Sequence, residues 1–126
     1  MLAIDTNVLV RIATRDDAAQ VASADSFIEP GAWVSILALA EAVWVLRTKY
    51  QRSPVGLVEA IEMFLQHESL VLEHSDAVAA ALDLFRSRPK LGFSDCLMLE
   101  LARKAGHLPF GTFDRGLGSV AGAQKL

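Results

Sequence analysis

Four acidic residues stand at positions where an ordinary surface carboxylate is not expected. Asp5 and Asp114 each follow a short apolar run that is typical of a buried strand. Glu41 and Asp95 fall on helical faces whose neighbours are mostly apolar, so we expect them on the side that faces the core. Because a buried carboxylate is rare unless it has a partner, these four acids are candidates for a functional site.

Carboxylates held close together repel each other and raise one another's pKa unless a cation neutralises them. A donor set made only of oxygen favours a hard divalent ion such as Mg²⁺ or Mn²⁺, whereas zinc calls for His or Cys ligands. The three histidines, His67, His74 and His107, are scattered and are expected at the surface or at helix ends. One or two ions on four carboxylates would activate a water for attack on a phosphodiester.

Two of the four acids also have ordinary explanations. Asp5-Thr6-Asn7 alone is typical of a strand-to-helix turn with a helix cap. Asp95 lies in the first turn of a predicted helix, where a carboxylate favours the helix dipole. Cys96 beside Asp95 suggests a thiol nucleophile, but no histidine stands in a partner position, so we expect Cys96 to pack in the core.

Apolar runs and turn signals predict that strands and helices alternate along the chain. We expect strands at residues 1–4, 33–34, 70–72 and 108–113. Helices are expected from a cap at Thr6 or Asn7 to about residue 13, from 16–17 to 28, from a cap at Ser35 to about 50, from Ser53-Pro54 onward, from Ser75 to Pro89, and from Ser94 to Gly106. The predicted class is α/β with three layers, α/β/α, and a mostly parallel central sheet. In such sheets ligands bind beyond the carboxyl ends of the strands, where we expect the four acids to converge.

The length and composition predict one folded domain, residues 1–126. The 126 residues are 52% hydrophobic and 21% charged, with a mean hydropathy of +0.34, which excludes a disordered protein. The longest apolar stretch, residues 32–46, is interrupted by Ser35 and Glu41 and is shorter than the roughly 20 residues of a membrane-spanning helix. The single cysteine excludes an internal disulfide, and the N-terminus lacks a signal-peptide pattern, so we expect the cytoplasm.

The charge balance leaves a nucleic-acid partner open. The net charge is −3, but it becomes +1 when the four candidate metal ligands are set aside. Basic residues gather in two stretches, which are Arg47, Lys49 and Arg52 beside Tyr50, and Arg86, Arg88 and Lys90.

In order and spacing, the motifs resemble those of PIN-domain ribonucleases, and most of all the VapC toxins of type II toxin–antitoxin systems. The segments that carry the resemblance are Asp5-Thr6-Asn7-Val8-Leu9, Glu41, Asp95 and Thr112-Phe113-Asp114. The resemblance covers essentially the whole chain, including its length and the order of its elements. One departure is Gly111, where an aliphatic residue is more usual in the family.

The resemblance implies an endoribonuclease that depends on Mg²⁺ or Mn²⁺. Its metal-binding and catalytic acids would be Asp5, Glu41, Asp95 and Asp114. Asn7 and Thr112 would match the polar residues that support the site, and Arg115 and Arg47, with the basic stretch 47–52, are candidate phosphate contacts. The RNA products would carry a 5′-phosphate and a 3′-hydroxyl. Members of the family usually form homodimers and are held inactive by a cognate antitoxin, whose C-terminal segment occupies the groove near the acids.

Proteins of three other kinds compete with this interpretation. A phospho-acceptor receiver domain would need paired acids after the first strand and a lysine after a late one, but Thr6 follows Asp5 and no lysine follows Phe113. A haloacid-dehalogenase-like phosphatase would have a second aspartate where Asn7 stands. A catalytically silent PIN-like module that binds RNA or a protein stays open, although an intact set of four acids argues against it.

Overall fold

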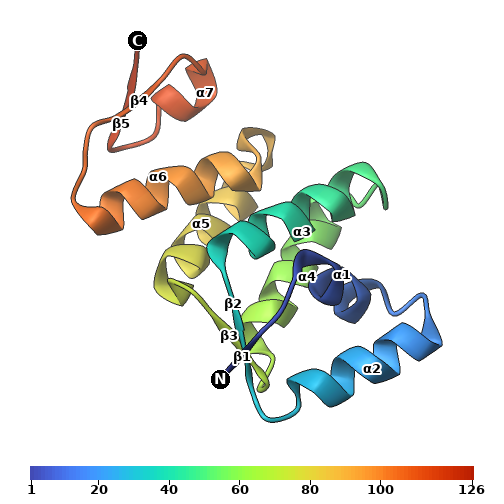
Figure 1. The fold of residues 1–126 in the computed structure, drawn as a ribbon. Coiled ribbons are helices and arrows are strands. Elements are labelled where there is room, and N and C mark those ends of the chain that lie inside the picture. The colour runs from blue at the N-terminus through green and yellow to red at the C-terminus, as the bar shows by residue number, and fades with distance from the viewer. The chain divides into compact units, whose positions relative to one another are not determined.

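The computed structural model describes residues 1–126. In chain order the elements of Figure 1 are β1 (Leu2–Ala3), α1 (Thr6–Thr14), α2 (Ala18–Ile28), β2 (Ala32–Val34), α3 (Ile36–Thr48), α4 (Pro54–Gln66), β3 (Leu70–Leu72), α5 (Ser75–Ser87), the 3-10 helix η1 (Pro89–Leu91), α6 (Phe93–Ala105), β4 (Phe110–Thr112), α7 (Arg115–Gly118) and β5 (Ala123–Lys125). Contacts divide the chain into two compact units, Met1–Ser75 and Asp76–Leu126. None of the helices combines the length and the apolar character that crossing a membrane requires.

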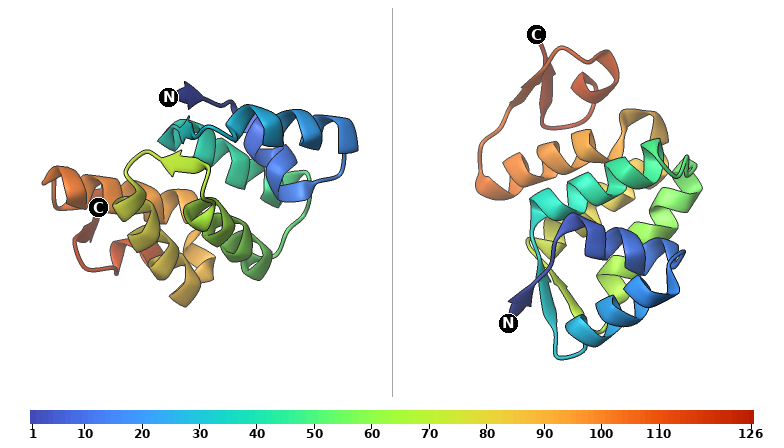
Figure 2. Two further views of the ribbon diagram at one scale, coloured as in Figure 1. Left: turned by 90° about the horizontal axis from the view of Figure 1, so that it is seen from below. Right: turned by 45° about the vertical axis from the view of Figure 1, so that its right-hand side comes forward.

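The first unit is built on a parallel sheet in the order β1-β2-β3, with its strands side by side in Figures 1 and 2. Because parallel strands joined by right-handed crossovers keep their helices on one face, α1 to α4 lie on the same side of this sheet. Alternate strand residues, including Ala32, Val34 and Leu70, are buried, whereas Trp33 and Val71 are partly exposed. The predicted α/β class with a parallel sheet is confirmed.

Short polar side chains start the helices of the first unit. The predicted caps of α3 and α4 are confirmed, because Ser35 Oγ accepts from Ala38 N at 3.0 Å and Ser53 Oγ from Gly56 N at 3.2 Å. The predicted cap of α1 is wrong: Thr6 is already helical, and Asp5 is the cap. Asp5 keeps an extended backbone, with φ −84° and ψ 163°, so its carboxylate can turn back to the first helical N–H.

Helix α1 is the centre of the packing in the first unit. It packs against α2 and α3, α3 packs against α4, and α4 packs against β3. Leu9 of α1, Leu39 and Leu46 of α3 and Phe64 of α4 are fully buried. The close contact of α1 with α3 brings the start of one helix toward the middle of the other.

The second unit contains the helices α5 and α6. The rings of Phe85 and Phe93 meet edge to face, with centroids 6.1 Å apart. Helix α6 begins at Phe93, one residue before the predicted Ser94, because Gly92 redirects the chain with φ +79°, a value that glycine tolerates best. Gly106 ends the helix in the left-handed conformation, as predicted.

The last predicted strand, 108–113, is shorter than expected and has an unexpected partner. The strand β4 covers only Phe110–Thr112 and pairs in parallel with β5 in a second, two-stranded sheet. The helix α7 between these strands packs tightly on β5, since a Cβ added at Gly118 would lie 2.7 Å from Lys125 Cβ. The sequence did not reveal α7 or β5 because both are too short to show a period.

Truncating the buried ring of Phe64 should destabilise the protein strongly. Phe64→Ala leaves a cavity beneath α4, so the free energy of unfolding should fall by about 3–5 kcal/mol. Phe113→Ala is the matched control, because its ring is 81% exposed, and a change within about 0.5 kcal/mol is expected. Urea denaturation followed by circular dichroism measures both, and equal losses would contradict this packing.

Candidate active site

In the first unit, Thr6 links the two predicted acids, Asp5 and Glu41. Asp5 Oδ1 accepts a hydrogen bond from Thr6 N at 2.7 Å. The Thr6 hydroxyl is buried and donates to Glu41 Oε2 at 3.0 Å. One residue therefore holds both carboxylates, and it does so through its backbone for the first and its side chain for the second.

Glu41 does not point into the core, as the helical pattern predicted. Its side chain is exposed, together with those of Leu37 and Trp44, which lie on the same face of α3. The core face of α3 is instead formed by residues such as Leu39, Val43 and Leu46. The apolar neighbours of Glu41 misled the pattern because α3 is apolar on nearly all sides, so periodicity alone does not reveal its inner face.

A hollow of about 450 Å³ opens beside Asp5, between α1 and α2. Its lining combines apolar side chains, such as Ala24 and Phe27, with Asp5, Asn7 and Arg11. Asn7 is exposed in the first turn of α1, and Arg11 follows it by one helical turn. The family resemblance indicated Asn7 but not Arg11, although the spacing of four residues places Arg11 on the same face of α1 as Asn7.

Arg11 is held in place by a polar network on the rim of this hollow. Its Nη1 donates to Asp16 Oδ1 at 2.9 Å and to the Tyr50 hydroxyl at 3.0 Å, and its Nε donates to Gln20. The Tyr50 hydroxyl donates to Asp16 Oδ2 at 3.1 Å. The hydroxyl of Thr14, a further member of the network, is the main cause of the lowered pKa of Asp16.

The predicted basic stretch 47–52 divides into structural and exposed residues. Tyr50 belongs to the Arg11 network, and Arg52 Nη2 donates to the Ala13 carbonyl at 3.3 Å, so both hold α3 against the end of α1. Arg47 and Lys49 are exposed and make no ion pair. Of these two residues, Arg47 lies in the last turn of α3.

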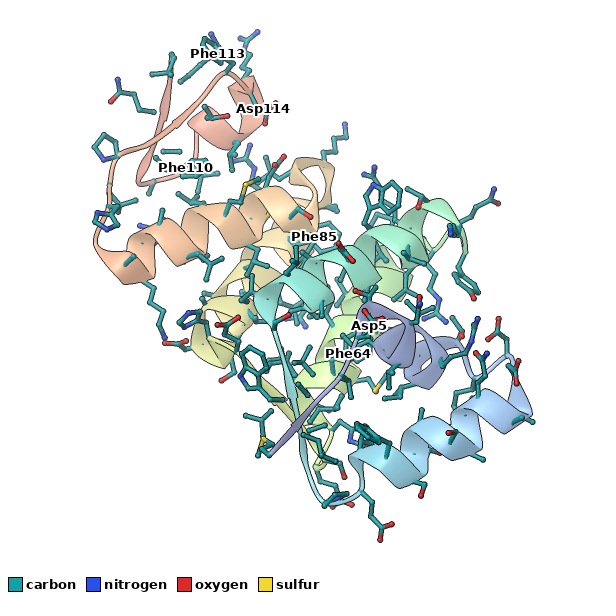
Figure 3. All side chains as sticks on the ribbon, in the orientation of Figure 1. Asp5, Phe64, Phe85, Phe110, Phe113 and Asp114 are labelled. Atoms are coloured by element: carbon teal, nitrogen blue, oxygen red, sulfur yellow. The ribbon has the colours of Figure 1, made fainter.

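In the second unit, Asp114 is the N-cap of α7, and Figure 3 shows it beside this helix. Its Oδ2 accepts from Leu117 N at 2.8 Å, and its own N–H donates to Thr112 Oγ1 at 3.0 Å. The Thr112 hydroxyl thus fixes the turn that presents this carboxylate. Arg115 follows Asp114 directly, is exposed and makes no hydrogen bond through its side chain.

Asp95 lies in the first turn of α6 and interacts electrostatically with Asp114. Partial burial and, to a smaller extent, the Asp114 carboxylate raise the pKa of Asp95. A nearby cation would relieve both costs. Its neighbour Cys96 is fully buried and its pKa is raised to about 11, mainly by burial, so it packs in the core as expected and is no nucleophile at neutral pH.

Carboxylate oxygens are the ligands that a hard divalent ion prefers. No three His, Cys, Asp or Glu side chains gather within either unit as a metal-binding group. Within the first unit, hydrogen bonds to Thr6 link Asp5 and Glu41. Within the second unit, the Asp114 carboxylate contributes to the raised pKa of Asp95. All donors are carboxylate oxygens, and the raised pKa of Asp95 marks a negative charge that protein groups do not compensate.

The histidines take the ordinary roles that the sequence predicts for them. His67 is the C-cap of α4, and its Nδ1 accepts a hydrogen bond from Ser69 N at 3.1 Å. His74 and His107 are exposed.

Comparison with known proteins gives one positive finding. Residues 2–123 match the family model described as PIN domain, so the match extends over both units. Neither the curated proteins nor the solved structures contain a significant match to the chain.

Removing the Thr6 hydroxyl should cost stability and free the Glu41 side chain. Thr6→Val keeps the shape of the buried residue but loses the bond to Glu41 Oε2, so the free energy of unfolding should fall by about 1 kcal/mol. Thr6→Ser retains the hydroxyl and is the control. Chemical denaturation of the three proteins measures the difference, and a Thr6→Val variant as stable as the wild type would show that the bond contributes nothing.

Neutralising Asp95 should stabilise the metal-free protein at neutral pH. An acid whose folded pKa is raised favours folding below its unfolded pKa, and this contribution is lost as the pH rises through the folded pKa. Asp95→Asn should therefore melt at a higher temperature than the wild type at pH 7 in a chelator, and the gain should shrink as the pH falls toward 3. Glu68→Gln, at an exposed site, should show no such trend. A gain in melting temperature that grows as the pH falls would contradict this prediction.

Proposed function

Because the chain belongs to the PIN domain family, whose members are in general metal-dependent nucleases, we propose that it is a Mg²⁺- or Mn²⁺-dependent endoribonuclease and the toxin of a toxin–antitoxin pair. The observation that carries this proposal is the pair of hydrogen bonds through which Thr6 links Asp5 to Glu41. It joins the end of β1 to the middle of α3 and holds two acids together in a chain whose match to the family covers residues 2–123.

We assign the metal ligands to Asp5, Glu41, Asp95 and Asp114. A bound divalent ion would supply an activated water and stabilise the charge on the leaving oxygen of the phosphodiester. The other residues orient these carboxylates. Thr6 fixes one oxygen of Glu41, and Thr112 fixes the turn that carries Asp114. Asn7 and Arg11, on the wall of the hollow beside Asp5, are placed to orient a substrate phosphate.

The RNA backbone needs positive contacts beyond the acids. Arg47 and Arg115 are exposed and make no ion pair, so their guanidinium groups are available to phosphates. Arg52, which belongs to the same basic stretch as Arg47, is already bonded to the Ala13 carbonyl and takes a structural role instead. Charge reversal at Arg47 and Arg115 should therefore weaken RNA binding.

An antitoxin and a second copy of the chain are the protein partners in this account. The hollow between α1 and α2 pairs apolar side chains, Phe27 among them, with the polar groups of Asp5, Asn7 and Arg11. An antitoxin segment with an apolar and a basic side chain would fit such a mixed lining and would cover Asp5. The cytoplasm, where RNA and antitoxin meet, is the expected location.

Antitoxin-free protein should cut end-labelled total RNA at discrete sites with Mg²⁺ or Mn²⁺ and not with a chelator. Asp5→Asn should lower the cleavage rate by more than ~100-fold, because loss of an outer-shell partner alone costs about 10–100-fold. Asparagine caps helices as well as aspartate does, so this variant keeps the start of α1 intact.

Glu68→Gln, at an exposed acid outside the site, is the matched control and should cleave like the wild type. The 5′ ends of the products should carry phosphate. Metal binding without any cleavage would contradict the proposed nuclease and favour a catalytically silent PIN-like module that binds RNA or a protein.

A further inference from the structure

A second hollow, of about 500 Å³, opens within the second unit beside Asp114. It is lined by Asp114, Gly116 and the segment Ser87–Leu91, which connects α5 to α6 through η1. Two cationic residues, Arg88 and Lys90, belong to this segment. Neither of them has a part in the metal ligation proposed above.

Arg88 is committed to holding α7. Its Nη1 donates to Ser119 Oγ at 3.1 Å, and its Nη2 donates to the Gly116 carbonyl at 3.2 Å. Because α7 is capped by Asp114, these bonds also fix the wall of the hollow that carries the carboxylate. Arg88 thus contributes positive charge to the hollow, but its guanidinium is already held by Ser119 and Gly116.

Lys90 differs from Arg88 because its side chain has no partner. It is exposed, and its ammonium makes no hydrogen bond or ion pair with any acid, Asp114 included. Its backbone is nevertheless well anchored, between Pro89 and the buried Leu91. Leu91 packs closely against α7, since a Cβ added at Gly116 would lie 3.2 Å from Leu91 Cδ2.

We infer that this hollow is a phosphate subsite in which Lys90 contacts a backbone phosphate of RNA bound at Asp114. Carboxylates alone would repel a polyanion, so a strand held next to Asp114 requires a cation nearby to offset that repulsion. A lysine ammonium binds phosphate as a point charge, and here it lies on a rigid segment within the same hollow as the acid. The inference rests on the proposed function, which it extends to a specific contact outside the metal ligands.

The test is the salt dependence of binding to a fluorescent single-stranded RNA in a chelator, where no cleavage occurs. Each phosphate contact contributes about −0.7 to the slope of log K against log salt for a single strand. Lys90→Ala should therefore make the slope less steep by about 0.7, whereas Lys90→Arg should keep the wild-type slope. Lys125→Ala removes the same charge from an exposed position on β5 and should leave the slope unchanged.

Equal slopes for the wild type and Lys90→Ala overturn the inference, as does a wild-type protein that binds no RNA. Binding of a fluorescent acidic peptide that depends on Lys90, together with RNA binding that does not, would assign the hollow to a protein segment instead and would also overturn the inference. If the wild type cleaves RNA but Lys90→Ala has the same salt slope as the wild type, the phosphate subsite is wrong and the nuclease proposal stands. If the slope depends on Lys90 but no cleavage occurs, the subsite stands and the nuclease proposal fails.

Discussion

The hydrogen bond from Thr6 Oγ1 to Glu41 Oε2 is the interaction on which the candidate site of the first unit depends. It joins α1 to α3, the pair of helices at the centre of that unit, and it comes from the same residue whose N–H binds Asp5. The acids are thereby held by the scaffold before any ion arrives. Carboxylates that are preorganised in this way would bind a divalent ion without a rearrangement of the protein.

In the second unit, a turn and not a pair of helices holds the candidate acid Asp114 in place. The Thr112 hydroxyl and the cap of α7 together fix Asp114, and Arg88 ties α7 to the connection between α5 and α6. Partial burial and, to a smaller extent, the Asp114 carboxylate raise the pKa of Asp95. A cation bound nearby would favour the ionised form of this carboxyl and lower its pKa again.

The sequence predicted those parts of the fold that depend on local signals. Ser35, Ser53-Pro54 and Gly106 mark helix ends through hydrogen bonds and backbone angles that involve only neighbouring residues, and all three predictions are confirmed. The pairing of β4 with β5 depends on contacts between residues far apart in the chain, and no local pattern encodes it. Glu41 shows a third case, since its residue type indicated a functional role while its helical neighbours indicated the wrong face.

Binding of Mn²⁺ tests most directly the claim that the two hydrogen bonds of Thr6 hold Asp5 and Glu41 as ligands of one metal ion. Titration calorimetry on the wild type, Asp5→Asn, Glu41→Gln and the double variant gives a complete cycle. Each single variant should lower the Mn²⁺ affinity by at least about 10-fold, and the double variant should lose less than the two losses combined, because ligands of one site are coupled. Independent losses that add, or an affinity unchanged in either single variant, would contradict a shared site.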